Sequence, residues 1–86
     1  MNKEELLRKF GKNVKIERIK KDLTQEKLAE RMNVSQNYIA NIERGKENMS
    51  LAKVLELSTF LDVDIDKLLN FSNEIYLKIR FQIKYR

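Results

Sequence analysis

Apolar residues recur every three or four positions from Glu4 to Asp22, which is the spacing of one face of an α-helix. The main stripe consists of Leu6, Leu7, Phe10, Val14 and the aliphatic stem of Arg18, and a weaker second stripe consists of Ile16 and Ile19. The pattern stops at Asp22-Leu23-Thr24, where the threonine side chain can cap a new helix. The sequence therefore predicts one helix over residues 4–22 and a second that begins at Thr24.

Two short helices are expected in the next twenty residues. The first ends at Asn33, because asparagine tolerates the left-handed backbone conformation that follows many helices. Ser35 is the expected N-cap of the next helix, and Gly45 is expected to end it. The apolar residues expected on the buried faces of these helices are Leu28, Ala29, Met32, Ile39 and Ile42.

A fourth helix is predicted to begin after Ser50, and a short fifth helix to run from Asp64 to about Leu69. The residues expected around the buried side of the fourth helix are Leu51, Val54, Leu55, Leu57, Ser58 and Leu61. The fifth helix adds Leu68 and Leu69 to the core. The predicted fold class is accordingly all-α, with five helices.

From Leu77 to Arg86 apolar and polar residues alternate strictly, which is the pattern of a half-buried β-strand. One face of this strand would consist of Leu77, Ile79, Phe81, Ile83 and Tyr85. No other segment has this pattern, so the expected partner is the same strand of a second molecule, paired antiparallel about a two-fold axis. We expect a domain over residues 1–71 and a dimerisation strand within residues 72–86. A frayed tail or a sixth helix is the alternative.

The amino-acid composition limits the classes of function that the protein can have. The 86 residues suffice for one domain, and they include no cysteine and no histidine, which removes the commonest metal ligands and the commonest general base. Asp62, Asp64 and Asp66 have a metal-like spacing, but they lack the glycine turn and distal glutamate of a calcium loop. We therefore expect no enzyme activity, no metal and no cofactor. With no signal-like N-terminus and no long apolar run, a cytoplasmic protein without membrane contact is expected.

The charge is unevenly distributed along the chain. Against an overall net charge of +5, residues 1–21 hold eight basic and three acidic side chains, whereas residues 47–76 hold two basic and six acidic ones. This asymmetry suits a protein that presents one face to a polyanion, although lysines that merely solvate the first helix would give the same composition.

Residues 24–44, TQEKLAERMNVSQNYIANIER, have the pattern of two short helices joined by a tight turn. Ala29 is small enough for a close helix crossing, and Asn33 suits the turn. The second helix leaves several positions outside the core: Gln36, Asn37, Tyr38, Ala40, Asn41 and Arg44. Amide and arginine side chains pair with base edges in the major groove. The segment therefore predicts a helix-turn-helix with an outward-facing recognition helix.

Over about residues 6–70 the sequence resembles the lambda-repressor-like family, the Cro and phage-repressor type of helix-turn-helix also called XRE. The matching segments are Leu23-Thr24-Gln25, Leu28-Ala29, Val34-Ser35, Ile39, Ile42-Glu43-Arg44-Gly45, Leu61-Asp62-Val63 and Leu68-Leu69. Asn33 replaces the usual turn glycine, and Glu47-Asn48-Met49-Ser50 lacks the proline often found before the fourth helix. Proline-free loops of this kind occur in the restriction–modification controllers of the family.

The resemblance implies roles for individual residues. Gln36, Asn37 and Asn41 would contact bases. Gln25 would bind a phosphate and brace the first recognition residue, and Ser35, Tyr38, Arg44 and Lys46 would contact the DNA backbone. Arg18 and Glu43 would form a partly buried ion pair between the first and third helices. Each has a plainer alternative: Ser35 as a cap, Tyr38 as a packing residue, Arg44 as a charge at a helix end.

The function expected from the resemblance is that of a dimeric transcriptional regulator, most simply a repressor, that recognises a palindromic operator in double-stranded DNA. A restriction–modification controller of the same fold is one alternative. An antitoxin-like module, which would use its C-terminal segment to bind a protein partner, is the other.

Overall fold

Side-chain caps begin four of the five helices in the computed structural model, which describes residues 1–71. The helices are α1 (Lys3–Lys20), α2 (Gln25–Met32), α3 (Gln36–Glu43), α4 (Leu51–Leu61) and α5 (Ile65–Leu69). Asn2, Thr24, Ser35 and Ser50 each accept a hydrogen bond from a backbone N–H three residues ahead, at 2.9–3.1 Å. The three caps predicted at Thr24, Ser35 and Ser50 are therefore confirmed. Asp64 precedes α5 without a side-chain cap.

Residues with a left-handed backbone conformation end or follow four of the helices. Asn33 has φ 56°, as predicted, and it is the C-cap of α2. Asp22 and Asp62 adopt the same conformation after α1 and α4, with φ 56° and 54°. The short polar side chains of asparagine and aspartate make this region accessible to them. Gly45, with φ 75°, follows α3.

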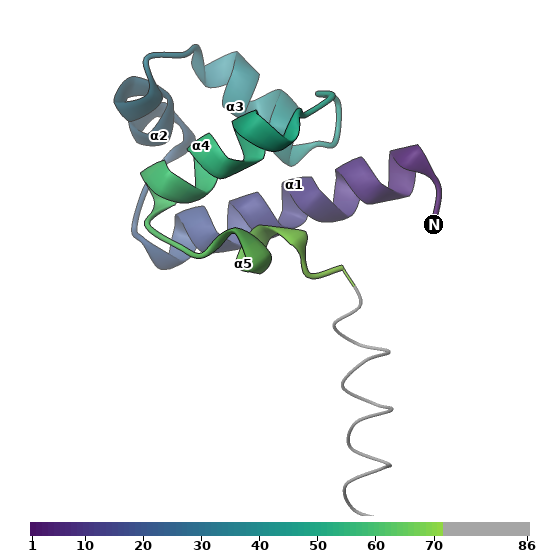
Figure 1. Cartoon of the computed structure of the whole chain (residues 1–86). Coiled ribbons are helices and arrows are strands. Elements are labelled where there is room, and N and C mark those ends of the chain that lie inside the picture. Colours follow the sequence, from purple (N-terminus) through teal and green to yellow (C-terminus); the bar gives the residue numbers. More distant parts are fainter. Residues whose placement is uncertain (72–86) are drawn as a thin grey trace, which may run out of the picture.

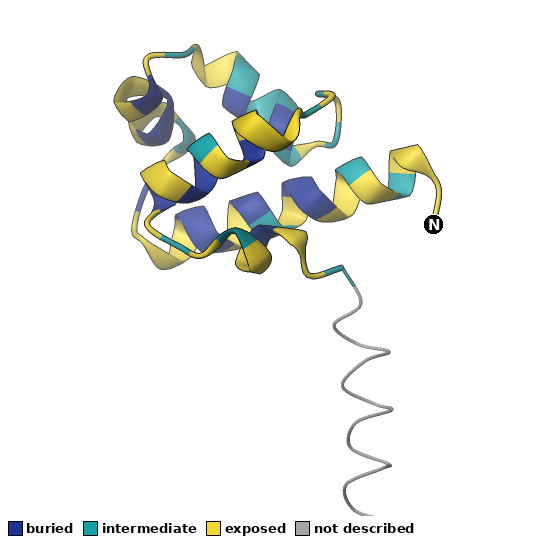
Figure 2. Ribbon diagram, in the orientation of Figure 1, coloured by how far each residue is buried: buried dark blue, intermediate teal, exposed yellow. Residues whose placement is uncertain are grey.

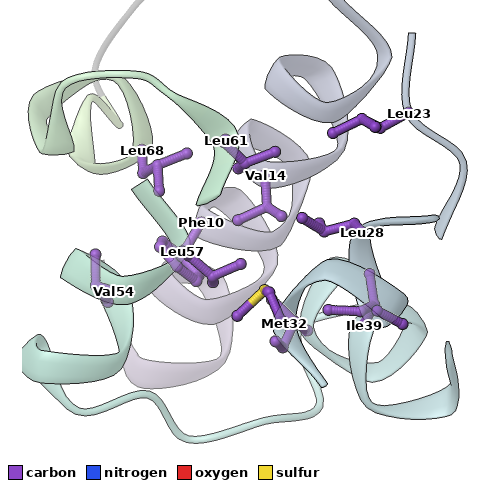
Figure 3. Packing of buried hydrophobic residues seen from close by; sticks show 12 residues of the cluster. Phe10, Val14, Leu23, Leu28, Met32, Ile39, Val54, Leu57, Leu61 and Leu68 are labelled. Atoms are coloured by element: carbon purple, nitrogen blue, oxygen red, sulfur yellow. The ribbon is translucent and has the colours of Figure 1, made fainter. Parts of the chain in front are cut away.

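The helices pack around one core, and α2, α3 and α4 lie above α1 in the view of Figure 1. α1 packs on α3 and α5, α2 packs on α3 and α4, and α4 packs on α5. Figure 3 shows the apolar side chains that converge between them. The core consists of Phe10, Val14, Leu23, Leu28, Ala29, Met32, Ile39, Ile42, Val54, Leu57, Leu61 and Leu68. The all-helical fold predicted for this part of the chain is confirmed.

The prediction for the buried side of α4 was partly wrong. Leu51 and Leu55 are 76% and 56% exposed, because the buried stripe of α4 is narrower than its apolar sequence and runs through Val54, Leu57, Ser58 and Leu61 (Figure 2). Two other helices also bury less of their apolar surface than the sequence suggested. The short α5 buries Leu68 and leaves Leu69 exposed. α1 buries one stripe of residues and leaves its remaining apolar residues more exposed. The exposed residues of α1 that had been placed in an apolar stripe are Leu6, Ile16 and Ile19.

The end of α5 is fixed to α1 by one side chain. Nδ2 of Asn13 donates to the carbonyl oxygens of Leu68 and Asn70, at 3.0 and 3.1 Å. These carbonyls lie at the end of a helix, where no intrahelical donor is available. Phe71 packs against the core next to this point. The strand predicted for residues 77–86 lies outside the described residues.

Candidate DNA-binding surface

The turn between α2 and α3 sets how the two helices cross. The backbone N–H groups of Asn33 and Val34 donate to the carbonyls of Glu30 and Ala29, at 3.2 and 3.0 Å. Two such bonds close the end of a helix in the way that a left-handed C-cap requires. Ala29 is 3% exposed, so the small residue expected at the crossing lies in the interior. α2 and α3 therefore form the helix-turn-helix predicted from residues 24–44.

The outer face of α3 is built from amide side chains. Ile39 and Ile42 are buried and hold one side of α3 to the core. Gln36 and Asn37, in the first turn, are exposed (Figure 2), and Asn41 is half-buried one turn later. Each amide offers both a donor and an acceptor, which is what base edges in the major groove require.

A buried ion pair fixes α3 to α1. Nε of Arg18 lies 2.6 Å from Oε2 of Glu43, and Nη2 lies 3.0 Å from Oε1, which gives the two parallel bonds of a bidentate pair. The side chains are only 9% and 3% exposed. Nη1 of Arg18 also donates to the carbonyl of Leu23, at 2.7 Å. The structure therefore contains the ion pair that the family resemblance implied.

Gln25 joins the same network from the start of α2. Its Nε2 donates to Oε1 of Glu43 at 3.0 Å, so one carboxylate oxygen accepts from both Arg18 and Gln25. An amide nitrogen carries two hydrogens, and the backbone N–H groups in the first turn of a helix have no intrahelical partner. The network therefore orients the Gln25 amide and still leaves donors at the N-terminus of α2.

The other expected contact residues lie around the end of α3. Nη2 of Arg44 donates to Oδ1 of Asn41, and Arg44 is exposed. Lys46 is exposed just after Gly45. Oγ of Ser35 is used as the α3 cap, and the half-buried Tyr38 packs against the core. Gln36, Asn37 and Asn41 belong to α3, and Arg44 is its C-cap. Gln25, at the start of α2, is joined to the end of α3 through Glu43.

Gly45 was expected to end the third helix, but the sequence did not predict that both glycines allow a close backbone contact. A Cβ on Gly11 would lie 2.6 Å from the carbonyl oxygen of Glu43, and a Cβ on Gly45 would lie 2.8 Å from the Cα of Arg8. Both contacts are too close for any side chain. The two glycines therefore let the backbone of α1 approach α3 and the loop after it. A glycine inside a helical pattern was the available signal for such a close approach.

The aspartates near α5 do not form a metal site. Within residues 1–71, no three histidine, cysteine, aspartate or glutamate side chains lie close enough together to bind a metal ion. Asp62 and Asp64 instead line an open hollow of about 440 Å³ with Ser58, Thr59, Val63 and Lys67. None of the described helices is long and apolar enough to span a lipid bilayer.

The fold and the amide face of α3 define a class: a DNA-binding regulator of the helix-turn-helix type. Residues 14–68 match the helix-turn-helix family HTH_3, and the chain belongs to this family. The resemblance to lambda-repressor-like proteins is thereby confirmed.

Named relatives come from two groups. Control protein C.BamHI of Bacillus amyloliquefaciens is 39% identical over 64 residues, which are 73% of this chain and 79% of that protein. The crystal structure of the restriction-modification controller protein C.AhdI from Aeromonas hydrophila has a TM-score of 0.67 and 39% identity, over 72% of this chain and 94% of that chain. An immunity repressor protein of Bacillus phage phi105 is 36% identical over 55 residues, 64% of this chain and 38% of that protein.

Proposed function

We propose that the protein is a dimeric, sequence-specific transcriptional regulator that inserts α3 into the major groove of a palindromic operator. The observation that carries this proposal is the amide face of α3, held at a fixed angle by the Arg18–Glu43 pair. A helix that is clamped on its inner side and covered with hydrogen-bonding groups on its outer side can present the same pattern of donors and acceptors to every site it meets.

Gln36, Asn37 and Asn41 are the proposed base-contacting residues. They lie on the part of the α3 surface that the buried Ile39 and Ile42 leave free. The bond from Arg44 occupies one lone pair of the Asn41 amide oxygen, which leaves the two Nδ2 hydrogens as the donors of this side chain. Asn41 would accordingly donate to a base acceptor such as N7 of a purine.

The proposed backbone contacts surround these residues. Gln25 would bind a phosphate through the second hydrogen of Nε2 and the N–H groups at the start of α2, where the helix dipole also favours an anion. Arg44 and Lys46 would bind phosphates through their charges. Ser35 is the N-cap of α3 and Tyr38 lies three residues further on; we infer that their hydroxyl groups contact the sugar–phosphate chain.

A dimer is proposed because a single short recognition helix contacts few base pairs. Two helices spaced one DNA turn apart, about 34 Å, would read both halves of a palindrome. The proposed dimer contact is the strand formed by Leu77, Ile79, Phe81, Ile83 and Tyr85, within a separate segment of residues 72–86 that follows the DNA-binding domain of residues 1–71. These residues lie outside the described part of the chain, so the proposal rests on their alternation in the sequence.

Among regulators of this family, the restriction–modification controller type is supported by the identity to C.BamHI and C.AhdI. The phage-repressor type is supported by the relative from phage phi105, over a shorter segment. A reporter-gene assay distinguishes the controller type from the repressor type. With the operator placed at several distances from a promoter, activation at any position supports a controller, and repression at every position supports a repressor.

Selection of bound sequences from random duplex DNA tests the proposed function itself. We expect enrichment of a two-fold symmetric sequence with half-sites about one helical turn apart. Recovery of a pool as random as the starting one would contradict sequence-specific recognition.

A further inference from the structure

The exposed surface of α1 carries a row of cations that the proposed base and backbone contacts do not use. Between residues 6 and 16 the helix contains Arg8, Lys9, Lys12 and Lys15 and no acidic residue. Arg8, Lys12 and Lys15 follow one another at i, i+4 and i+7 and are exposed. We call these three residues the α1 basic stripe. Like charges at this spacing repel each other and destabilise a helix, so the stripe costs the free protein stability.

Internal ion pairs do not neutralise the stripe. The ion pairs within residues 1–71 join Arg18 to Glu43, Lys20 to Glu17, Lys27 to Glu30 and Lys53 to Glu56. The stripe residues take part in none of these, so within the described chain their charges face solvent.

The stripe lies on the side of α1 that adjoins α3. Gly11 contacts the backbone of α3. Arg8 and Lys15 are its neighbours on the helix surface, three residues before and four after it. At one end the stripe meets the loop after α3, because Gly45 lies directly against the backbone of Arg8. Lys46 is the next residue and is exposed, so a further cation lies close to this end of the stripe.

We propose that the α1 basic stripe binds phosphates of the same DNA duplex, beyond those reached from α2 and α3. This proposal rests on the proposed function. The stripe spans about 10 Å along the axis of α1, the length over which one DNA strand places about three phosphates. Such contacts carry no base information. They extend the electrostatic part of binding and leave the choice of sequence to α3.

The test compares two double variants of the full chain that remove the same charge. Lys12→Gln/Lys15→Gln removes two cations of the stripe. The control, Lys20→Gln/Lys67→Gln, removes two exposed lysines from the far end of α1 and from α5. Affinity for a long duplex that contains the selected operator, and for one of random sequence, is measured at several salt concentrations. Thermal unfolding monitors the fold of both variants.

We expect the stripe variant to weaken binding to both duplexes by the same factor. The slope of log affinity against log salt should become shallower by about 0.9 for each phosphate that is no longer neutralised, so by up to about 3.6 for a dimer, which loses two lysines in each protomer. The control should keep a slope close to that of the wild type.

A stripe variant that matches the control overturns the inference while the proposed function stands. If the wild-type protein binds the operator duplex no more tightly than the random duplex, both the inference and the proposed function are overturned. Weaker binding of the stripe variant to phosphatidylglycerol vesicles, with unchanged DNA affinity, would also overturn the inference, in favour of a membrane surface.

Discussion

Arg18 and Glu43, 25 positions apart in the sequence, form a bidentate ion pair in the interior, with N–O distances of 2.6 and 3.0 Å. The pair fixes α3 against α1, and through Glu43 it also holds the amide of Gln25 at the start of α2. One carboxylate therefore positions both elements that are proposed to contact DNA.

Replacing Arg18 by methionine should destabilise the fold by about 3–5 kcal/mol, because Glu43 would remain buried and uncompensated. Arg18→Met combined with Glu43→Leu should recover much of that stability. Recovery should be incomplete, since the carbonyl of Leu23 and the amide of Gln25 also lose partners in the network. Urea unfolding of the two single variants and the double variant gives the coupling free energy. Additive effects would rule out the pair as a coupled unit.

Gly11→Ala should destabilise the protein although alanine favours helices. Helix propensity alone predicts a gain of about 1 kcal/mol. The added Cβ would meet the carbonyls of Ile42 and Glu43, and overpacking of this kind typically costs about 1–3 kcal/mol. The expected result is a lower urea midpoint and weaker DNA binding, because α3 must move. Lys9→Ala, an exposed change on the same helix, serves as the control. A higher midpoint for Gly11→Ala would contradict the close approach of the two helices.

Lys46→Ala should weaken binding to operator and random duplexes alike. A lysine that neutralises one phosphate contributes about 0.9 to the salt slope, so a dimeric variant that lacks two such lysines should show a slope shallower by about 1.8. Filter binding at several salt concentrations measures it. A weakening confined to the operator would instead place Lys46 against a base.

Deleting residues 77–86 should give a folded monomer that binds the operator much more weakly. The core and the helices α1 to α5 lie within residues 1–71, so the helical content should be kept, and sedimentation at micromolar concentration reports the oligomeric state. A truncated protein that still sediments as a dimer would place the dimer contact elsewhere, with α5 as the next surface to test.

The ends of the helices could be predicted because they depend on residues that are close together in the sequence. Caps such as Ser35 and the left-handed turn at Asn33 depend on residues a few positions apart, and these were predicted correctly. Leu51 and Leu55 were misplaced because an apolar residue beside a buried stripe resembles one within it until the neighbouring helices are known. The approach of Gly11 to α3 joins distant segments, as do the bonds from Asn13 to the end of α5. A glycine within a helical pattern can indicate that some backbone comes close, but sequence spacing does not show which distant segments are in contact.

The candidate site was predictable in part for the same reason. The amide face of α3 follows from the helical spacing of Gln36, Asn37 and Asn41 once the isoleucines of α3 are assigned to the core. The Arg18–Glu43 pair came from the family resemblance, because nothing local relates the two residues. The bond from Gln25 to Glu43 was not foreseen. It depends on how the start of α2 meets the end of α3, which is a property of the assembled domain.

The central claim is that α3 determines the DNA sequence that the protein binds. It is tested most directly by the ratio of affinities for the selected operator and a random duplex, measured for the wild type, Gln36→Ala and Asn41→Ala. We expect a wild-type ratio of about 10³ or more, and a decrease of about 1–3 kcal/mol in binding free energy on the operator for each variant, with little change on random DNA. Equal decreases on both duplexes, or a wild-type ratio near one, would contradict the claim.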